Sequence, residues 1–300
     1  MRPLGTIASS VQTAPAFVGP AGVSANILAW WDTSATGVVK NAAGATAANN
    51  DYVSRVVNRY TGTGTLGDLV QPTGGIQMQY QTNVTYKTTS GRKGIIGDGV
   101  GAYMVPSNAL AGGSVDYSCY FVARNRFNTG DDVIVGFCSD VITEVNGGGN
   151  FYVMGAFANN GTGKSILKNF TTDFWVNNAQ NDPARASYIR YAPASLVLGN
   201  AAYITGGTLT QGDASSSGAT ASWGVGTPNF IVGTDNAGAT NLANLAIGAD
   251  ALDVVADPVF GGTNGWGYSQ TEIAEVIIYS GIHSRADALA ILTYLNSKWL

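Results

Sequence analysis

Short apolar runs separated by polar turns recur along the chain from Asn26 onward. They are rich in Val, Ile, Tyr and Phe, which favour strands, and the intervening segments, such as FNTGD and VNGGGN, carry turn-forming residues. The clearest runs are ILAWWD (27–32), YSCYFVARN (117–125), DVIVGFC (132–138), FYVMGAF (151–157), SYIRYA (187–192), NFIVG (229–233) and EIAEVIIYS (272–280). Many short strands with turn signals between them predict an all-β sandwich or barrel.

One segment, at the carboxyl end, has helical periodicity instead. Ser284 followed by Asp287 resembles a capping box, in which each side chain satisfies a free amide of the first turn. The apolar residues that recur at helical spacing after it are Ala288, Leu289, Ile291, Leu292, Leu295 and Trp299. This pattern predicts one helix, from about residue 285 to about residue 297, docked at the end of the β-domain.

The first 25 residues are rich in Pro, Gly, Ala and Ser and show no periodicity. They predict an extended arm over residues 1–25 that is ordered only against a partner, through main-chain hydrogen bonds or apolar side chains. The remaining 26–300 are expected to form one folded domain that does not need the arm.

Charged residues make up only 11% of the chain, against about 25% in a typical soluble domain. The net charge of −4 provides no basic patch for nucleic acid. No apolar stretch reaches the roughly 18 residues that span a bilayer, and the amino terminus is a poor signal peptide. We therefore expect a chain folded in a cytosol, with no nucleic-acid partner and no membrane insertion. Its neutral polar surface is nevertheless typical of proteins that work outside cells.

A P-loop-like spacing occurs in AFANNGTGKS (156–165), where Ala158 precedes Gly163-Lys164-Ser165 by the required interval. A working P-loop needs a helix after it, whose amino terminus cradles the phosphates. The following ILKNFTTDFW has no helical stripe. The stretch therefore predicts a hairpin turn and no nucleotide site.

Few residues suit catalysis. His283 is the one histidine of the chain, and we expect it to pack or to face solvent. Glycosidases need two carboxylates in one cleft. Glu272 and Glu275 lie three apart on a predicted strand, which places them on opposite faces of a sheet. We predict no catalytic residue.

Metal and thiol chemistry are weakly indicated. Asp250, Asp253 and Asp257 could gather around calcium, but acidic residues in such a loop more often form turns. We predict no metal and no cofactor. Cys119 and Cys138 flank a turn, which places them on neighbouring strands of one hairpin, close together and reduced.

Four aromatic residues lie in predicted loops and are candidates for carbohydrate binding. They are Trp175, Trp223, Trp266 and Tyr268. Exposed rings stack on the apolar faces of sugars, while neighbouring Asn and Asp bind hydroxyls. The alternative is that each ring caps an open end of the sandwich.

The stretch GYSQTEIAEVIIYSGIHSRADALAILTYLNSKW (267–299) resembles the end of a concanavalin A-like, laminin-G-like domain. That family ends in a strand of the form G-x-I-A-E-hydrophobic-hydrophobic-x-Y, followed by a helix ending near Y-L-x-x-K-W. Upstream, ILAWWDTS (27–34), GRKGIIGDGVGAYM (91–104) and LAIGAD (245–250) resemble further family segments. The resemblance implies a two-sheet antiparallel jelly-roll sandwich.

The family fold serves lectins, glycosidases and structural modules, and it is frequent in structural proteins of tailed bacteriophages. The resemblance therefore implies a non-enzymatic virion surface protein: a capsid decoration, fibre or tail-associated module. In that interpretation the arm binds other virion proteins, the chain forms a homo-oligomer in the particle, and a host-surface glycan is a further partner. A bacterial carbohydrate-binding module or adhesin is the alternative, and an enzyme ranks third.

Overall fold

The computed structural model describes a β-protein with one α-helix among its described residues. These are residues 17–71, 73–86, 89–98, 101–108, 117–124, 132–139, 154–158, 165–169, 172–176, 185–192, 195–200, 209–211, 221–222, 231–233, 242–248, 272–281 and 283–300. All strand pairings described within its sheets are antiparallel. The all-β class with a carboxyl-terminal helix is confirmed.

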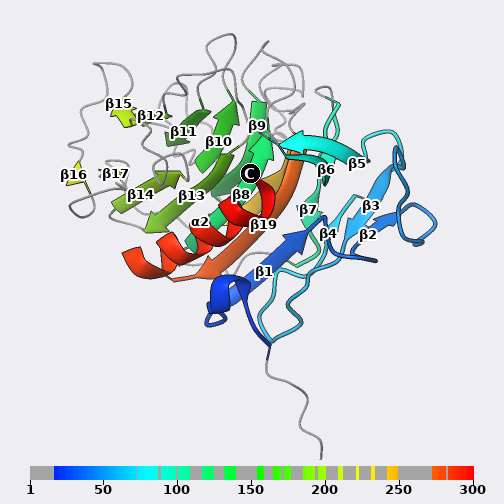
Figure 1. Cartoon of the computed structure of the whole chain (residues 1–300), viewed down its shortest axis with the longest axis horizontal. Helices are drawn as coiled ribbons and strands as arrows, with labels where there is room; N and C mark the ends of the chain where they lie inside the picture. Colours follow the sequence, from blue (N-terminus) through cyan, green and yellow to red (C-terminus); the bar gives the residue numbers. More distant parts are fainter. Residues whose placement is uncertain are drawn as a thin grey trace, which may run out of the picture.

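The large sheet has nine strands within the described residues, in the order β16-β17-β14-β13-β8-β19-β6-β5, with β1 added beside β19. Their bounds are β1 Ile27–Asp32, β5 Gln79–Tyr86, β6 Thr89–Ile96, β8 Tyr117–Arg124, β13 Arg185–Ala192, β14 Ser195–Asn200, β16 Ala221–Ser222, β17 Ile231–Gly233 and β19 Glu272–Ser280. Figure 1 shows β1 and β19, from opposite ends of the chain, side by side in this sheet.

Two smaller sheets are described as well. The six-stranded one runs β15-β12-β11-β10-β9-β18, and the four-stranded one runs β2-β3-β4-β7. Their bounds are β2 Val39–Asn41, β3 Val53–Val56, β4 Leu69–Val70, β7 Val105–Pro106, β9 Asp132–Ser139, β10 Met154–Ala158, β11 Ser165–Asn169, β12 Thr172–Val176, β15 Leu209–Gln211 and β18 Leu242–Ile247. Met104 and Ile247 join the two by a bridge, with N···O distances of 3.0 and 2.9 Å. The two smaller sheets therefore form one layer, and the large sheet forms the other layer of the sandwich.

The first core cluster lies between the large sheet and the smaller sheets. It joins Trp31, Phe121 and Ile278 of the large sheet to Val53 of β3 and Ile247 of β18. Alternate residues of the large sheet point the other way, because successive side chains of a strand face opposite sides. They belong to a second cluster, under the helix.

The second cluster packs the large sheet against α2 (Arg285–Trp299). Tyr120 and Ile277 of the sheet meet Ile291 and Leu295 of the helix. In Figure 1 the helix crosses β8 and β19. Strand β19 is thus buried on both faces, which explains why apolar residues occupy both of its faces and do not alternate with polar ones.

Helix α2 begins where the sequence predicts. Ser284 accepts a hydrogen bond from the Asp287 amide at 3.1 Å, and its hydroxyl donates to the Asp287 carboxylate at 2.6 Å. The predicted stripe is buried at all positions except Leu289, which is half-buried. The predicted helix is therefore confirmed.

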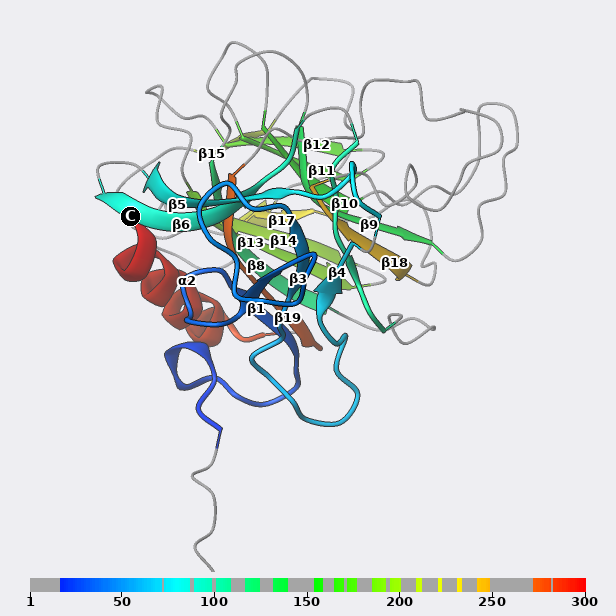
Figure 2. The same ribbon diagram turned by 90° about the vertical axis from the view of Figure 1, so that its right-hand side faces the viewer.

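Part of the predicted arm, residues 1–16, lies outside the described residues. The part that is described contains a 3-10 turn, η1 (Pro20–Gly22). Val23 packs against the second cluster, and its carbonyl accepts a hydrogen bond of 3.0 Å from the Tyr279 hydroxyl. Figure 2 shows this segment next to α2. An arm that binds a partner stays a prediction.

A bulge in β19 overturns one expectation about carboxylates. Ile273 pairs with Ala123 and Glu275 with Val122, so Ala274 is an extra residue opposite β8. Ala274 packs in the second cluster and Glu275 contacts α2, so both face the helix. Glu272 lies two residues before Ala274 and shares that face. The expectation that Glu272 and Glu275 face opposite sides is wrong, since an extra residue shifts the alternation.

The P-loop-like stretch spans two paired strands. Ala158 of β10 pairs with Ser165 of β11 in antiparallel register, and β11 follows where a P-loop requires a helix. The two strands pair as a hairpin requires, while the predicted turn residues 159–164 lie outside the described residues.

The predicted cysteine hairpin is wrong. Cys119 lies in β8, which pairs with β13 and β19, whereas Cys138 lies in β9, which pairs with β10 and β18. The two strands belong to different sheets, because the chain crosses between layers after β8. Cys119 is buried as a free thiol.

Candidate functional site

Of the four predicted carbohydrate-binding aromatics, the described residues include only Trp175. It lies in β12, paired with Ile166 and Thr210, and is therefore in a strand and not in a loop. Trp223, Trp266 and Tyr268 lie outside the described residues, as do Asp250, Asp253 and Asp257. A glycan contact at these aromatic positions stays a prediction.

A cluster of ionised groups lies beneath α2. Asp32 of β1 and Glu275 of β19 are register partners, and both bind the Lys298 ammonium. The Nζ lies 2.8 Å from Asp32 Oδ2 and 2.7 Å from Glu275 Oε2. Arg59 Nη1 lies 2.6 Å from the same Asp32 oxygen. Two strands and the helix are thereby joined through two carboxylates.

Three aromatic side chains also contact the Glu275 carboxylate through their polar groups. The indoles of Trp30 and Trp299 each donate a hydrogen bond of 2.6 Å, one to each carboxylate oxygen. The Tyr294 hydroxyl lies 3.3 Å from Oε1. Indole nitrogens only donate, so this arrangement holds the carboxylate as an acceptor.

Burial acts on both carboxylates, but with different net results. It raises the pKa of Glu275, aided by the charge of Asp32 and opposed by Lys298 and Trp299. It would also raise the pKa of Asp32, but Lys298 and the hydrogen bonds from Ser34 outweigh it and hold that pKa below the ordinary value of an aspartate. Asp32 and Glu275 are only 1% and 0% exposed, so a sugar cannot reach them. We conclude that this cluster fixes the helix to the sheet.

His283 packs, as expected. Its Nδ1 lies 2.8 Å from the Tyr120 hydroxyl, and its ring centroid lies 4.2 Å from that of Tyr279. Burial lowers the pKa of the imidazole, partly opposed by the charge of Asp287. The described side chains contain no group of three His, Cys, Asp or Glu residues suited to a metal ion. No described helix is long and apolar enough to cross a membrane.

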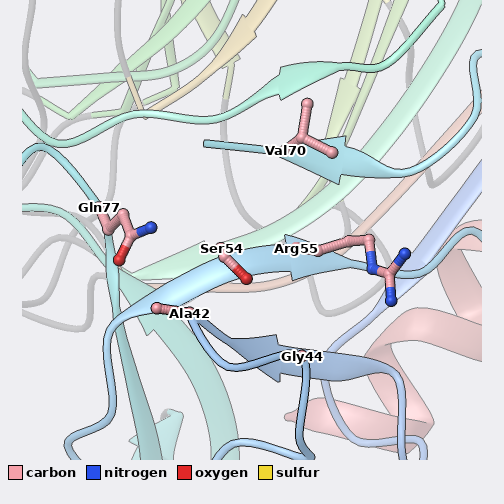
Figure 3. A pocket seen from close by; sticks show the side chains of 6 residues that line it. All are labelled: Ala42, Gly44, Ser54, Arg55, Val70 and Gln77. Atoms are coloured by element: carbon pink, nitrogen blue, oxygen red, sulfur yellow. The ribbon is translucent and has the colours of Figure 1, made fainter. Parts of the chain in front are cut away.

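The candidate ligand site is an open hollow of about 440 Å³ on the four-stranded sheet. It is lined by Ala42, Gly44, Ser54, Arg55, Val70 and Gln77. In Figure 3, Gln77 and Arg55 lie at opposite ends, with Ser54 between them.

A bulge in β3 creates this lining. Lys40 pairs with Arg55 and Asn41 with Val53, so Ser54 is an extra residue. Val53 and Val56 are both 0% exposed, and the two residues between them, Ser54 and Arg55, turn outward together. The Ser54 hydroxyl donates to the Asn41 carbonyl at 2.5 Å, which fixes its rotamer.

Chemically, the hollow offers hydrogen-bonding groups around a small apolar floor. The Arg55 side chain is 46% exposed, and its Nε lies 3.7 Å from Asp68 Oδ2. The Gln77 amide donates 2.8 Å to the Gln71 carbonyl, which holds it in place. Guanidinium, hydroxyl and amide groups suit the hydroxyls of a sugar. Sequence reasoning missed this hollow. The alternation of Gln with apolar residues in QMQYQ (77–81) was the available signal, since Gln79 and Gln81 are half-buried while Met78 and Tyr80 are buried.

No protein-family model and no curated protein sequence matches the chain, but solved structures are similar to it. An arabinofuranosidase in complex with arabinofuranosyl-α-1,2-xylobiose has a TM-score of 0.52 and 11% identity, over 91% of this chain and 63% of that chain. Trypanosoma rangeli sialidase in complex with 2,3-difluorosialic acid has a TM-score of 0.49 and 9% identity, over 98% of this chain and 36% of that chain. The enzymatically active domain of bacteriophage CBA120 tailspike protein 2 has a TM-score of 0.38 and 11% identity, over 73% of this chain and 29% of that chain.

The chain thus spans about a third of the sialidase and less than two thirds of the arabinofuranosidase. At these identities the likeness shows the fold alone, a β-architecture shared with carbohydrate-processing proteins. It does not confirm the concanavalin A-like jelly roll that the terminal motif implies.

These comparisons contradict two expectations from the sequence, a non-enzymatic virion protein and a chain that is not an enzyme. The arabinofuranosidase, which has a TM-score of 0.52 to this chain, is an enzyme. The sequence argument relied on a terminal motif whose residues build the helix–sheet contact. Such residues report on the fold and not on the activity.

Proposed function

We propose that this chain is a carbohydrate-active domain whose glycan binds in the hollow of the four-stranded sheet. The observation that carries the proposal is the hollow itself, with the Arg55 guanidinium exposed beside Ser54 and Gln77. Sugar hydroxyls need donors and acceptors that are already oriented, and two of these three side chains are held by backbone hydrogen bonds.

The fold supports the same class of function. The arabinofuranosidase, whose structure contains a branched xylobiose, shares the strand arrangement over most of this chain. We also propose that the fold is a concanavalin A-like jelly roll over residues 26–300. The support is that Glu275, Lys298 and Trp299 of the terminal motif meet in one cluster.

The test is titration of the full chain with arabinoxylan and with xylan, arabinan and cellulose oligosaccharides, followed by calorimetry. Release of reducing sugar is measured in parallel, because a carbohydrate-active domain can bind, cleave or do both. We expect saturable binding of at least one of these glycans, weakened about tenfold or more by Arg55→Ala.

The control is Lys93→Ala, which removes a cation from β6 of the large sheet. The Nζ of Lys93 donates to the Ser34 carbonyl at 3.4 Å. This variant should bind as the parent chain does. No binding and no sugar release with any of these glycans would overturn the proposal.

A further inference from the structure

An exposed tyrosine lies beside the hollow. Tyr52 is 59% exposed, one of three large hydrophobic side chains in the described residues with such exposure, besides Phe17 and Val18. It pairs with Gln79 of β5 in an isolated bridge. It also lies two residues before Ser54, which lines the hollow, and therefore faces the same side of the strand.

The segment that pairs with Tyr52, residues 77–81, presents side chains to the same face as Tyr52. Gln77, which lines the hollow, is only 5% exposed and precedes β5. Gln79 and Gln81 of β5 are half-buried, while Met78 and Tyr80 on either side of Gln79 are buried in the first core cluster. Alternate residues of a strand project from one face. Gln79 and Gln81 therefore share one face that begins next to the hollow residue Gln77, and Tyr52 pairs with Gln79.

Two asparagines from the β2–β3 connection extend this row. Asn50 has a φ of 70°, which Asn tolerates, and its amide donates 2.7 Å to the Tyr80 carbonyl. The Gln81 amide nitrogen donates to Asn50 Oδ1 at 3.1 Å and to Gln79 Oε1 at 2.9 Å. Asn49 Oδ1 accepts from the Thr82 amide at 2.8 Å and from its hydroxyl at 3.0 Å. These bonds hold the amides in fixed orientations.

Hydrogen-bonding capacity remains on this face. Within the described residues, Asn49 Nδ2, Asn50 Nδ2 and Gln81 Oε1 make no hydrogen bond, although each belongs to a side chain that is otherwise held. Two donors and one acceptor thus stand beside an exposed aromatic ring. This set matches a sugar, which offers an apolar face to the ring and hydroxyls to the amides.

We propose that Tyr52 and the amides of Asn49, Asn50 and Gln81 form an extended binding surface for a linear, uncharged glycan that continues out of the hollow. The four side chains of this surface are neutral, so the ligand we propose is an uncharged chain. The carboxylate of Asp51, which precedes Tyr52 in the sequence, accepts hydrogen bonds from the Asn41 side chain at 3.1 Å and from the Ala48 amide at 2.9 Å. This inference rests on the proposed function, since it assigns the rest of the glycan to a chain whose end lies in the hollow.

The experiment uses the full chain and linear xylo-, cello- and arabino-oligosaccharides of two to six units. We expect affinity to rise with length for at least one series, because longer chains reach the surface beyond the hollow. Tyr52→Ala should weaken binding of the hexamer about tenfold and leave the dimer nearly unaffected. Gln81→Ala should weaken the hexamer less strongly, and Tyr52→Trp should retain its binding.

Phe17→Ala is the matched control, because Phe17 is also an exposed aromatic residue, at 39%, and lies against Trp30 and Tyr60. It should bind every length as the parent chain does. Thermal unfolding of each variant separates lost binding from lost folding. If affinity does not rise with length, or if Tyr52→Ala binds the hexamer normally while Arg55→Ala does not, the extended surface is wrong and the hollow stands. If no oligosaccharide binds the parent chain, both proposals fail.

Discussion

A single ammonium group serves two buried carboxylates in this protein. Lys298 lies within 2.8 Å of Asp32 and 2.7 Å of Glu275, and both acids are almost fully shielded from water. Removing one partner of a buried ion pair leaves an uncompensated charge, which costs more than the pair contributes when intact. Here the loss would leave two neighbouring like charges, with Arg59 near only one of them.

We therefore expect Lys298→Ala to lower the free energy of unfolding by about 3–5 kcal/mol. Chemical denaturation at neutral pH, followed by tryptophan fluorescence, measures this. Lys93→Ala, which removes a single 3.4 Å hydrogen bond to a carbonyl, should stay within about 1 kcal/mol of the parent. Equal stability of the two variants would show that the cluster does not hold the helix.

At the scale of elements, the helix and seven of the nineteen described strands were predicted, because each of these carries a clear local signal. The Ser284 cap and the apolar stripe define α2, and runs such as EIAEVIIYS define strands. The bulges at Ala274 and Ser54 could not be predicted, because the position of an extra residue depends on the strand it pairs with and not on the local sequence. The hollow depends on the second bulge, so its lining could not be assembled from the sequence. The second layer is also formed by pairings that periodicity does not show.

The cap of α2 gives a prediction of its own. Ser284→Ala removes the acceptor of the Asp287 amide, and we expect a loss of about 1 kcal/mol in the free energy of unfolding. Ser297→Ala is the matched change inside the same helix, where the hydroxyl only donates to the Tyr294 carbonyl. It should be neutral or slightly stabilising, because Ala is the better helix former. Denaturation curves that coincide for the two variants would rule out a capping role.

At the scale of the molecule, the described residues form a helix layer, the large sheet, and a layer made of the two smaller sheets. Residues 17–25 contribute to the first of these. The buried Tyr279 hydroxyl donates to the Val23 carbonyl, and η1 lies beside α2. An unmade hydrogen bond on a buried hydroxyl destabilises the fold.

We expect deletion of residues 1–25 to lower the melting temperature by several degrees relative to deletion of residues 1–16. The longer deletion removes Val23 and Phe17 and leaves the Tyr279 hydroxyl without its acceptor, a loss of about 1–3 kcal/mol. Differential scanning calorimetry of the two truncated chains measures the difference. Equal melting temperatures would mean that residues 17–25 are only a tether.

The pairing of β1 with β19 has a consequence for the order of folding. Ile27 is the partner of Tyr279, and Trp30 donates to Glu275 across 245 positions of sequence. The middle of the large sheet cannot form until β19 has left the ribosome. Until then, the strand edges of β1, β6 and β8 that pair with β19 remain unpaired. Contacts this distant in sequence make folding slow, and open edges favour association with other chains. We therefore expect a larger soluble yield when the protein is synthesised slowly at low temperature, which leaves more time for β19 to pair with β8.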